Sequence, residues 1–220
     1  LYIDHFKQVA RIVEAHGKRP MIWADILTHY PEVIPELKGG TIAMPWVYGP
    51  EKDYTRHVAP FAASKVPTFI ATAVTNWEDI TPKFTRTFDN VDQFLAAGRK
   101  YGVLGMLHTG WTDDAHVLFR PALPAVAYGV IAPWQAAPID RASFYSDYAR
   151  QLYPPAVAPH VAAALDALEK SDDLLFDGLG GRTRYQMWLD SLDPKRLKFY
   201  AYHREQLREM VGRDAFLARQ

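Results

Sequence analysis

The first half of the chain alternates between helical and strand-like patterns of apolar residues. Apolar side chains recur at helical spacing over residues 1–16, and Gly17 ends that pattern. The same spacing predicts helices over residues 54–66 and 89–100, and a short helix over 31–37. Four apolar runs rich in β-forming residues predict strands within residues 20–25, 41–48, 67–75 and 103–109. Strands that alternate with helices indicate an α/β fold with a parallel sheet.

The strand pattern ends before Leu118, and the remainder of the chain is helical in pattern. Residues 122–134 are apolar with many small side chains, as expected for a helix that packs closely on a sheet. Three more helices are predicted over residues 143–153, 157–175 and 194–211. We therefore expect βα units in one half of the chain and helices in the other, with a boundary between residues 135 and 136.

A tryptophan ends each of the four predicted strand segments. These residues are Trp23, Trp46, Trp77 and Trp111. The carboxyl ends of parallel strands meet at one edge of a sheet, where α/β proteins bind their ligands. Four indoles at that edge would form the wall of a pocket, and the flat C–H face of a pyranose ring stacks well on such a wall. The other two tryptophans, Trp134 and Trp188, lie in predicted helices and are expected to pack.

Polar side chains follow three of these four tryptophans at a spacing of two residues. Asp25 follows Trp23, Tyr48 follows Trp46, and Asp113 follows Trp111. An aromatic wall with a few convergent polar groups is the usual composition of a small-ligand site. The sequence leaves open the alternative that the tryptophans only cap the core.

Other pairs of ionisable residues give weaker indications of chemistry. Asp172 and Asp173 are adjacent near a predicted helix end, where we expect both to be solvated. Histidine and aspartate residues that could in principle hold a metal are His108, Asp113, Asp114 and His116. Their spacing matches no closed metal site, and we interpret His108 as a core histidine. We expect neither a metal nor a cofactor.

Composition excludes several classes of protein. The chain has 220 residues, 49% of them hydrophobic, which is enough apolar material for a globular core. With 25 basic and 25 acidic side chains its formal net charge is zero, so we expect no nucleic-acid partner. It has no cysteine, and no run of 18 apolar residues that would indicate a membrane partner.

Three segments of the chain are distinctive: residues 16–25 (HGKRPMIWAD), 45–48 (PWVY) and 109–116 (TGWTDDAH). They resemble glycoside hydrolase family 20, the β-N-acetylhexosaminidases, and most of all its hexosaminidase D type. Residues 121–129 also resemble the last barrel helix of that subgroup. The resemblance implies a (β/α)8 TIM barrel whose last four βα units are residues 1–135. Residues 136–220 would then be a helical extension packed on the barrel.

The resemblance also implies a mechanism. These enzymes remove terminal N-acetylhexosamine with retention, and the substrate's own acetamido oxygen attacks the anomeric carbon. A glutamate acts as the general acid, and the preceding aspartate orients the acetamido group. That pair follows the fourth barrel strand, which would precede Leu1, and no His-x-Gly-Gly-Asp-Glu segment occurs in the chain. We therefore expect a sugar-binding half without catalytic residues, inactive in isolation.

Several residues correspond to the family's sugar site. The tryptophans that wall that site correspond to Trp23, Trp46 and Trp111. Asp113 resembles the acidic residue that holds the outer hydroxyls of the sugar, and Tyr48 would reach the acetamido group. Where many members place a tyrosine, this chain has Asn76 and Trp77.

The expected ligand is an N-acetylhexosamine-containing glycan or glycoside. A half barrel leaves two open sheet edges, so we also expect pairing with the missing N-terminal half-barrel or with a second copy of the chain. Two alternatives stay open: a non-catalytic carbohydrate-binding α/β module, and an unrelated α/β domain with structural tryptophans.

Overall fold

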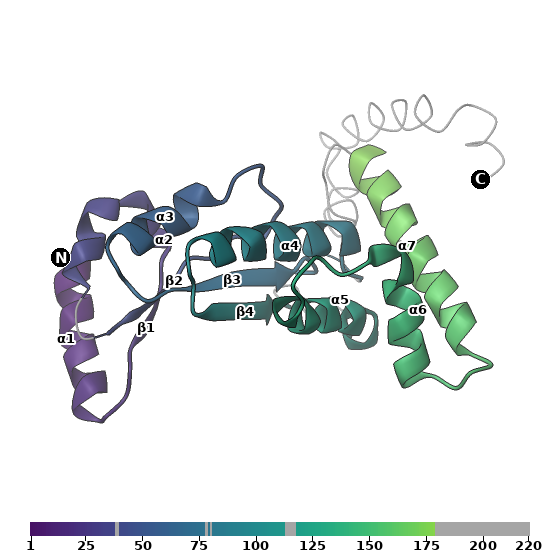
Figure 1. The fold of residues 1–220 in the computed structure, drawn as a ribbon, viewed down its shortest axis with the longest axis horizontal. Coiled ribbons are helices and arrows are strands. Elements are labelled where there is room, and N and C mark those ends of the chain that lie inside the picture. Colours follow the sequence, from purple (N-terminus) through teal and green to yellow (C-terminus); the bar gives the residue numbers. More distant parts are fainter. Residues whose placement is uncertain (38–39, 78, 80, 113–117, 179–220) are drawn as a thin grey trace, which may run out of the picture. The chain divides into compact units, whose positions relative to one another are not determined.

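The computed structural model describes residues 1–37, 40–77, 79, 81–112 and 118–178, shown as a coloured ribbon in Figure 1. The fold is mixed α/β with short parallel strands, and the chain forms two compact units. The first unit comprises residues 1–75, 86–110 and 125–139. The second comprises residues 76–85, 111–124 and 140–220.

The first unit contains the predicted alternation of helices and strands. In chain order the elements are α1 (Tyr2–Ala15), β1 (Met21–Trp23), α2 (Asp25–His29), the 3-10 helix η1 (Pro31–Glu36), β2 (Ile42–Met44), α3 (Thr55–Ala63), β3 (Phe69–Val74), α4 (Phe84–Lys100), β4 (Gly105–Gly110), α5 (Phe119–Ile131) and η2 (Ala132–Trp134). The first residues of α4 and of α5 belong to the second unit. Helix α4 begins before the predicted start at residue 89, and the short helix α2 was not predicted.

The four strands are parallel, and their order in space is their order in the sequence. Strand β1 pairs with β2, and β3 pairs with β4. Two parallel bridges, Ala43 to Thr68 and Trp46 to Ala71, join β2 to β3. Between these bridges Pro45 has no N–H to donate, which interrupts the ladder, and pairing resumes where Ala71 N donates to Pro45 O (2.9 Å) and Val47 N donates to Ala71 O (3.1 Å).

Helices cover one face of these strands. Ile22 and Ala43 on that face belong to a buried cluster with residues of α2, η1 and α3. Farther along the sheet, Ile70 packs against Gly98 of α4, and His108 packs against Gly129 of α5. Figure 1 shows α4 running beside β3 and β4. Since side chains alternate along a strand, the neighbouring positions point to the opposite face.

The opposite face is apolar, and part of it is exposed. Its outer positions include Met21 on β1 and Leu107 on β4, which are 49% and 41% exposed. Trp23 and Trp46 lie on the same face. Among the described elements of the first unit, the helical layer is therefore on one side of the strands.

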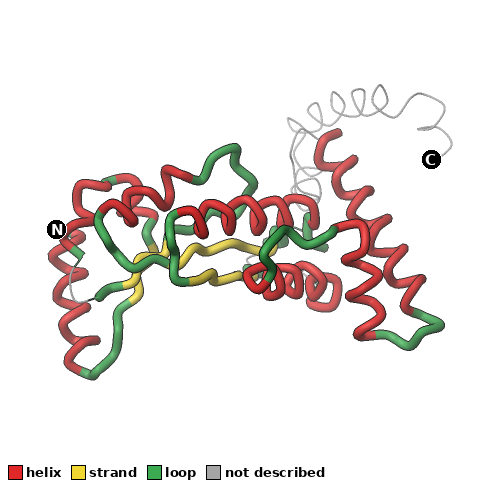
Figure 2. Tube along the Cα trace, in the orientation of Figure 1, coloured by secondary structure: helices red, strands yellow, loops and turns green. Residues whose placement is uncertain are grey.

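The described part of the second unit consists mainly of helices. Helices α6 (Arg141–Leu152) and α7 (Ala158–Gly178) lie side by side and antiparallel, as Figure 2 shows. Helix α6 begins where the Asp140 carboxylate accepts a hydrogen bond from Ala142 N (3.2 Å), an N-cap. The Tyr145 hydroxyl of α6 donates to Glu169 of α7 (2.8 Å). The predicted helix over residues 194–211 lies outside the described residues. Among the residues that the structure describes, no helix has the length and apolar character of a membrane span.

Candidate functional site

Two of the predicted tryptophans share one face at the carboxyl ends of β1 and β2. Trp23 ends β1 and pairs with Met44, whereas Trp46 lies two residues beyond Met44 on the neighbouring strand. Residues two apart on a strand point to the same face, so both indoles lie on the face that the helices leave open. They are 37% and 41% exposed. Strand spacing and rise place their Cα atoms about 8 Å apart, which suits two neighbouring rings on one wall.

Tyr48 extends this wall. Its ring centroid lies 4.8 Å from that of Trp46, with an angle of 34° between the ring planes. This tilted contact brings the two rings together and restricts the orientation of each. The three aromatic residues Trp23, Trp46 and Tyr48 are hereafter called the aromatic wall.

Asp25 lies at the start of α2. It is the second residue after Trp23 and is exposed at the carboxyl end of β1. Tyr2 of α1 lies near enough that its pKa is raised, first by burial and then by the negative charge of Asp25. The aromatic faces of the wall suit a ligand with an apolar ring face, and Asp25 is the carboxylate nearest to Trp23 in the sequence.

For the other residues predicted to bind a ligand, the structure shows no contact with the aromatic wall. Trp77 and Trp111 belong to the second unit, the former half-buried and the latter 39% exposed. Asp113 and Trp188 lie outside the described residues. Trp134, which we expected to pack in a helix, is instead 84% exposed at the end of η2.

Three residues that the sequence did not indicate support the wall from behind. Asn90 of α4 is fully buried and donates hydrogen bonds to the carbonyl oxygens of Val47 (2.8 Å) and Gly49 (3.3 Å). Tyr54 is also buried, and its hydroxyl lies 3.1 Å from the Asn90 amide. Thr75 donates to the carbonyl oxygen of Tyr48 (3.5 Å). These contacts fix the segment that carries Tyr48.

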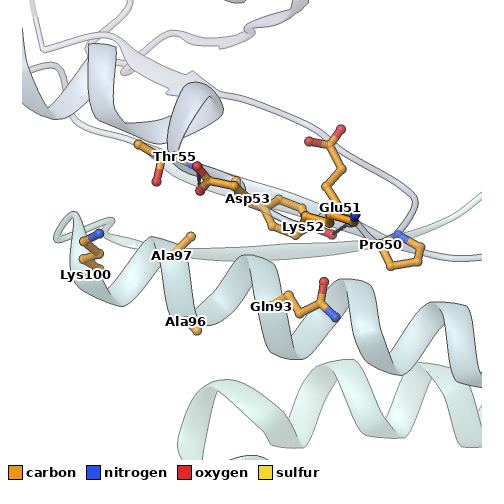
Figure 3. A pocket seen from close by; sticks show the side chains of 10 residues that line it. Pro50, Glu51, Lys52, Asp53, Thr55, Gln93, Ala96, Ala97 and Lys100 are labelled. Carbon is orange, nitrogen blue, oxygen red and sulfur yellow. Dashed lines mark hydrogen bonds between the residues drawn. The ribbon is translucent and has the colours of Figure 1, made fainter.

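A pocket of about 600 Å³ lies between residues 50–55 and α4 (Figure 3). Its lining consists of residues 50–55 and of Gln93, Ala96, Ala97 and Lys100. Glu51 already contacts Arg56 (2.9 Å) and His57 (3.0 Å). Asp53 accepts a hydrogen bond from Thr55 N (2.8 Å), and the contacts with Thr55 lower its pKa. None of the residues that we predicted to bind a ligand belongs to this lining.

His108 lies on the helix-covered face, which agrees with its interpretation as a core histidine. Its Nδ1 is 2.8 Å from Thr72 Oγ1, and its ring lies against Gly129. Burial lowers the pKa of His108 to about 4, so the ring is neutral at pH 7. The described residues contain no cluster of potential metal ligands. The other members of the possible metal set, Asp113, Asp114 and His116, lie outside the described residues.

The expectation that Asp172 and Asp173 are solvated is wrong for Asp172. Helix α7 continues to residue 178, so the pair is not at a helix end. Asp172 is 4% exposed and accepts a hydrogen bond from Thr81 (3.5 Å). Thr85 Oγ1 lies 2.7 Å from Asp173 and 2.8 Å from Glu169. Asp172 therefore ties α7 to Thr81 before α4, and Asp173 ties it to Thr85 in the first turn of α4.

No known family model and no curated protein matches the chain. The likeness to glycoside hydrolase family 20 therefore rests on the sequence motifs, and any activity has to be inferred from these motifs together with the site.

Proposed function

We propose that this chain is the sugar-binding half of a family 20-type glycoside hydrolase, which holds terminal N-acetylhexosamine on the aromatic wall. The observation that carries this proposal is the placement of Trp23 and Trp46 on one open face, at the carboxyl ends of adjacent parallel strands. A pyranose ring would stack on the indoles, and the Asp25 carboxylate would accept hydrogen bonds from its hydroxyls. Trp77, Trp111 and Asp113 are proposed as further sugar contacts, on the strength of the motifs.

The arrangement of the strands supports a barrel as the parent fold. In doubly wound sheets the strand order reverses, and helices cover both faces. In a (β/α)8 barrel each strand lies beside its sequence neighbours, and the helices form an outer ring. Here the spatial order β1-β2-β3-β4 follows the sequence, and the described helices of the first unit cover one face. In this proposal residues 1–135 form half of a barrel, and residues 136–220 extend it.

The proposed reaction is retaining hydrolysis in which the acetamido oxygen of the substrate is the nucleophile. The wall would orient the sugar so that this oxygen faces the anomeric carbon. The general acid and the aspartate beside it would come from the missing N-terminal half-barrel, since the chain has no His-x-Gly-Gly-Asp-Glu segment. The isolated chain is therefore expected to bind the sugar without hydrolysing it.

The test is a tryptophan-fluorescence titration of the chain with N-acetylglucosamine and, separately, with glucose. We expect a saturable change with the acetamido sugar alone, because acetamido recognition is what the family resemblance implies. Trp46→Phe and Trp23→Phe should each reduce the signal. Trp134→Phe is the matched control, since Trp134 is exposed and lies outside the wall. A silent titration, or a response that only Trp134→Phe removes, would refute the proposal.

A further inference from the structure

Asn90 of α4 is fully buried, and its amide donates hydrogen bonds to Val47 O, Gly49 O and the Tyr54 hydroxyl, all in the segment after β2. We infer that Asn90 is a positioning residue that fixes Tyr48, and with it Trp46, in the aromatic wall. Its link to ligand binding rests on the proposed function, whereas its effect on the ring positions does not.

The hydrogen bonds determine how the amide is oriented. Its amino group faces the carbonyl oxygens of Val47 (2.8 Å) and Gly49 (3.3 Å), and these acceptors require a donor. Its carbonyl oxygen faces the backbone N–H of Ala73 on β3 (3.4 Å), which requires an acceptor. An asparagine satisfies both sides at once, so α4 links the segment after β2 to the neighbouring strand.

These hydrogen bonds involve the residues on both sides of Tyr48. The carbonyl groups before and after it bind Asn90, and its own carbonyl oxygen accepts a hydrogen bond from Thr75 (3.5 Å). Tyr54 closes the turn, because its hydroxyl donates to Gly49 O (2.9 Å) and accepts from Glu51 N (3.2 Å). The last backbone hydrogen bond to β3 in this segment is donated by Val47 N to Ala71 O (3.1 Å), so beyond Val47 these side chains hold the backbone in place of a ladder.

A fixed backbone at Tyr48 has a consequence for binding. Two aromatic rings held in place before the ligand arrives lose less conformational entropy when they bind it than two mobile rings do. Loss of the Asn90 amide should therefore weaken sugar binding even though Asn90 is buried and cannot touch the sugar. We expect the dissociation constant to rise about tenfold.

The experiment compares Asn90→Leu, which keeps the approximate shape, with Tyr54→Phe and with the control Tyr128→Phe. The control removes a different buried hydrogen bond of α4, from Tyr128 to Asp92 (2.8 Å). Each variant is also made with Trp46→Phe, so that the difference between the paired spectra isolates the emission of Trp46. Circular dichroism confirms that each variant is folded.

Asn90→Leu should shift the emission and increase the acrylamide quenching of Trp46, and raise the dissociation constant for N-acetylglucosamine about tenfold. Tyr54→Phe, the milder variant, should act in the same direction, and Tyr128→Phe should change neither measurement. If folded Asn90→Leu and Tyr54→Phe both leave Trp46 emission unchanged, the inference is overturned. If the unmodified chain binds no sugar, the proposed function fails, and the Trp46 spectra still decide the positioning role.

Discussion

Replacing Gly129 of α5 by alanine tests the packing of α5 against β4. In a helix interior alanine is favoured over glycine by about 1 kcal/mol. At this position, however, the added Cβ would lie 2.3 Å from Cδ2 and 2.4 Å from Cγ of His108. The imidazole cannot simply move away, because Thr72 holds its Nδ1 at 2.8 Å. Overpacking of this kind costs about 1–3 kcal/mol. Gly129→Ala should therefore lower the free energy of unfolding by up to about 2 kcal/mol, despite the gain in helix propensity.

The sign of the effect should reverse once the ring is gone. In a His108→Ala background the clash is removed, so Gly129→Ala should raise the free energy of unfolding by about 1 kcal/mol. Urea unfolding of the four proteins measures this cycle. Gly110→Ala is the control, because nothing lies within 4 Å of its added Cβ. If Gly129→Ala stabilises the unmodified chain, or has the same effect in both backgrounds, this account of the α5–β4 packing is wrong.

Two further predictions concern pH and association. Burial lowers the pKa of His108 from 6.5 to about 4, so protonation favours the unfolded chain. The stability from the neutral ring is complete above pH 6.5 and is lost as the pH falls to 4. Urea unfolding should therefore show that the free energy of unfolding falls by about 3 kcal/mol between pH 6.5 and 4. His108→Ala should not show this fall. Light scattering should show that the unmodified chain forms a dimer or a larger species. Leu107→Lys should favour the monomer. A monodisperse, stable monomer of the unmodified chain would contradict the half-barrel proposal.

Much of the first unit could be predicted from the sequence because its strands are short apolar runs separated by clear helical periods. The positions of Trp23 and Trp46 at the carboxyl ends of strands followed from those runs, and the register of β1, β2 and β3 adds that both share one face. Helix α2 was missed because five residues are too short for a helical period to be recognised. Its sequence, DILTH, has only two apolar residues and is equally compatible with a loop.

Asn90 and Asp172 could not be predicted because their roles depend on distant segments. Asn90 is one of several polar residues in the sequence of α4. Nothing near it in the sequence indicates that its side chain donates a hydrogen bond to Val47 O. Asp172 is a charged residue in an amphipathic helix, a position that is usually solvated. Its burial arises from Thr81, which is 91 residues away. Local patterns define elements, whereas the partners of buried polar groups are set by tertiary structure.

The exposure of the open sheet face follows from the number of neighbouring strands rather than from the type of residue. Ile42 on the inner strand β2 is 8% exposed, whereas Met21 on β1 and Leu107 on β4 are 49% and 41% exposed on the same face. An open edge strand that had to face water would be expected to carry charged side chains at such positions. Apolar residues at both outer strands are instead suited to burial by further strands on either side. This gradient agrees with the proposed barrel, in which the aromatic wall would lie at the rim of the interior that such strands would enclose.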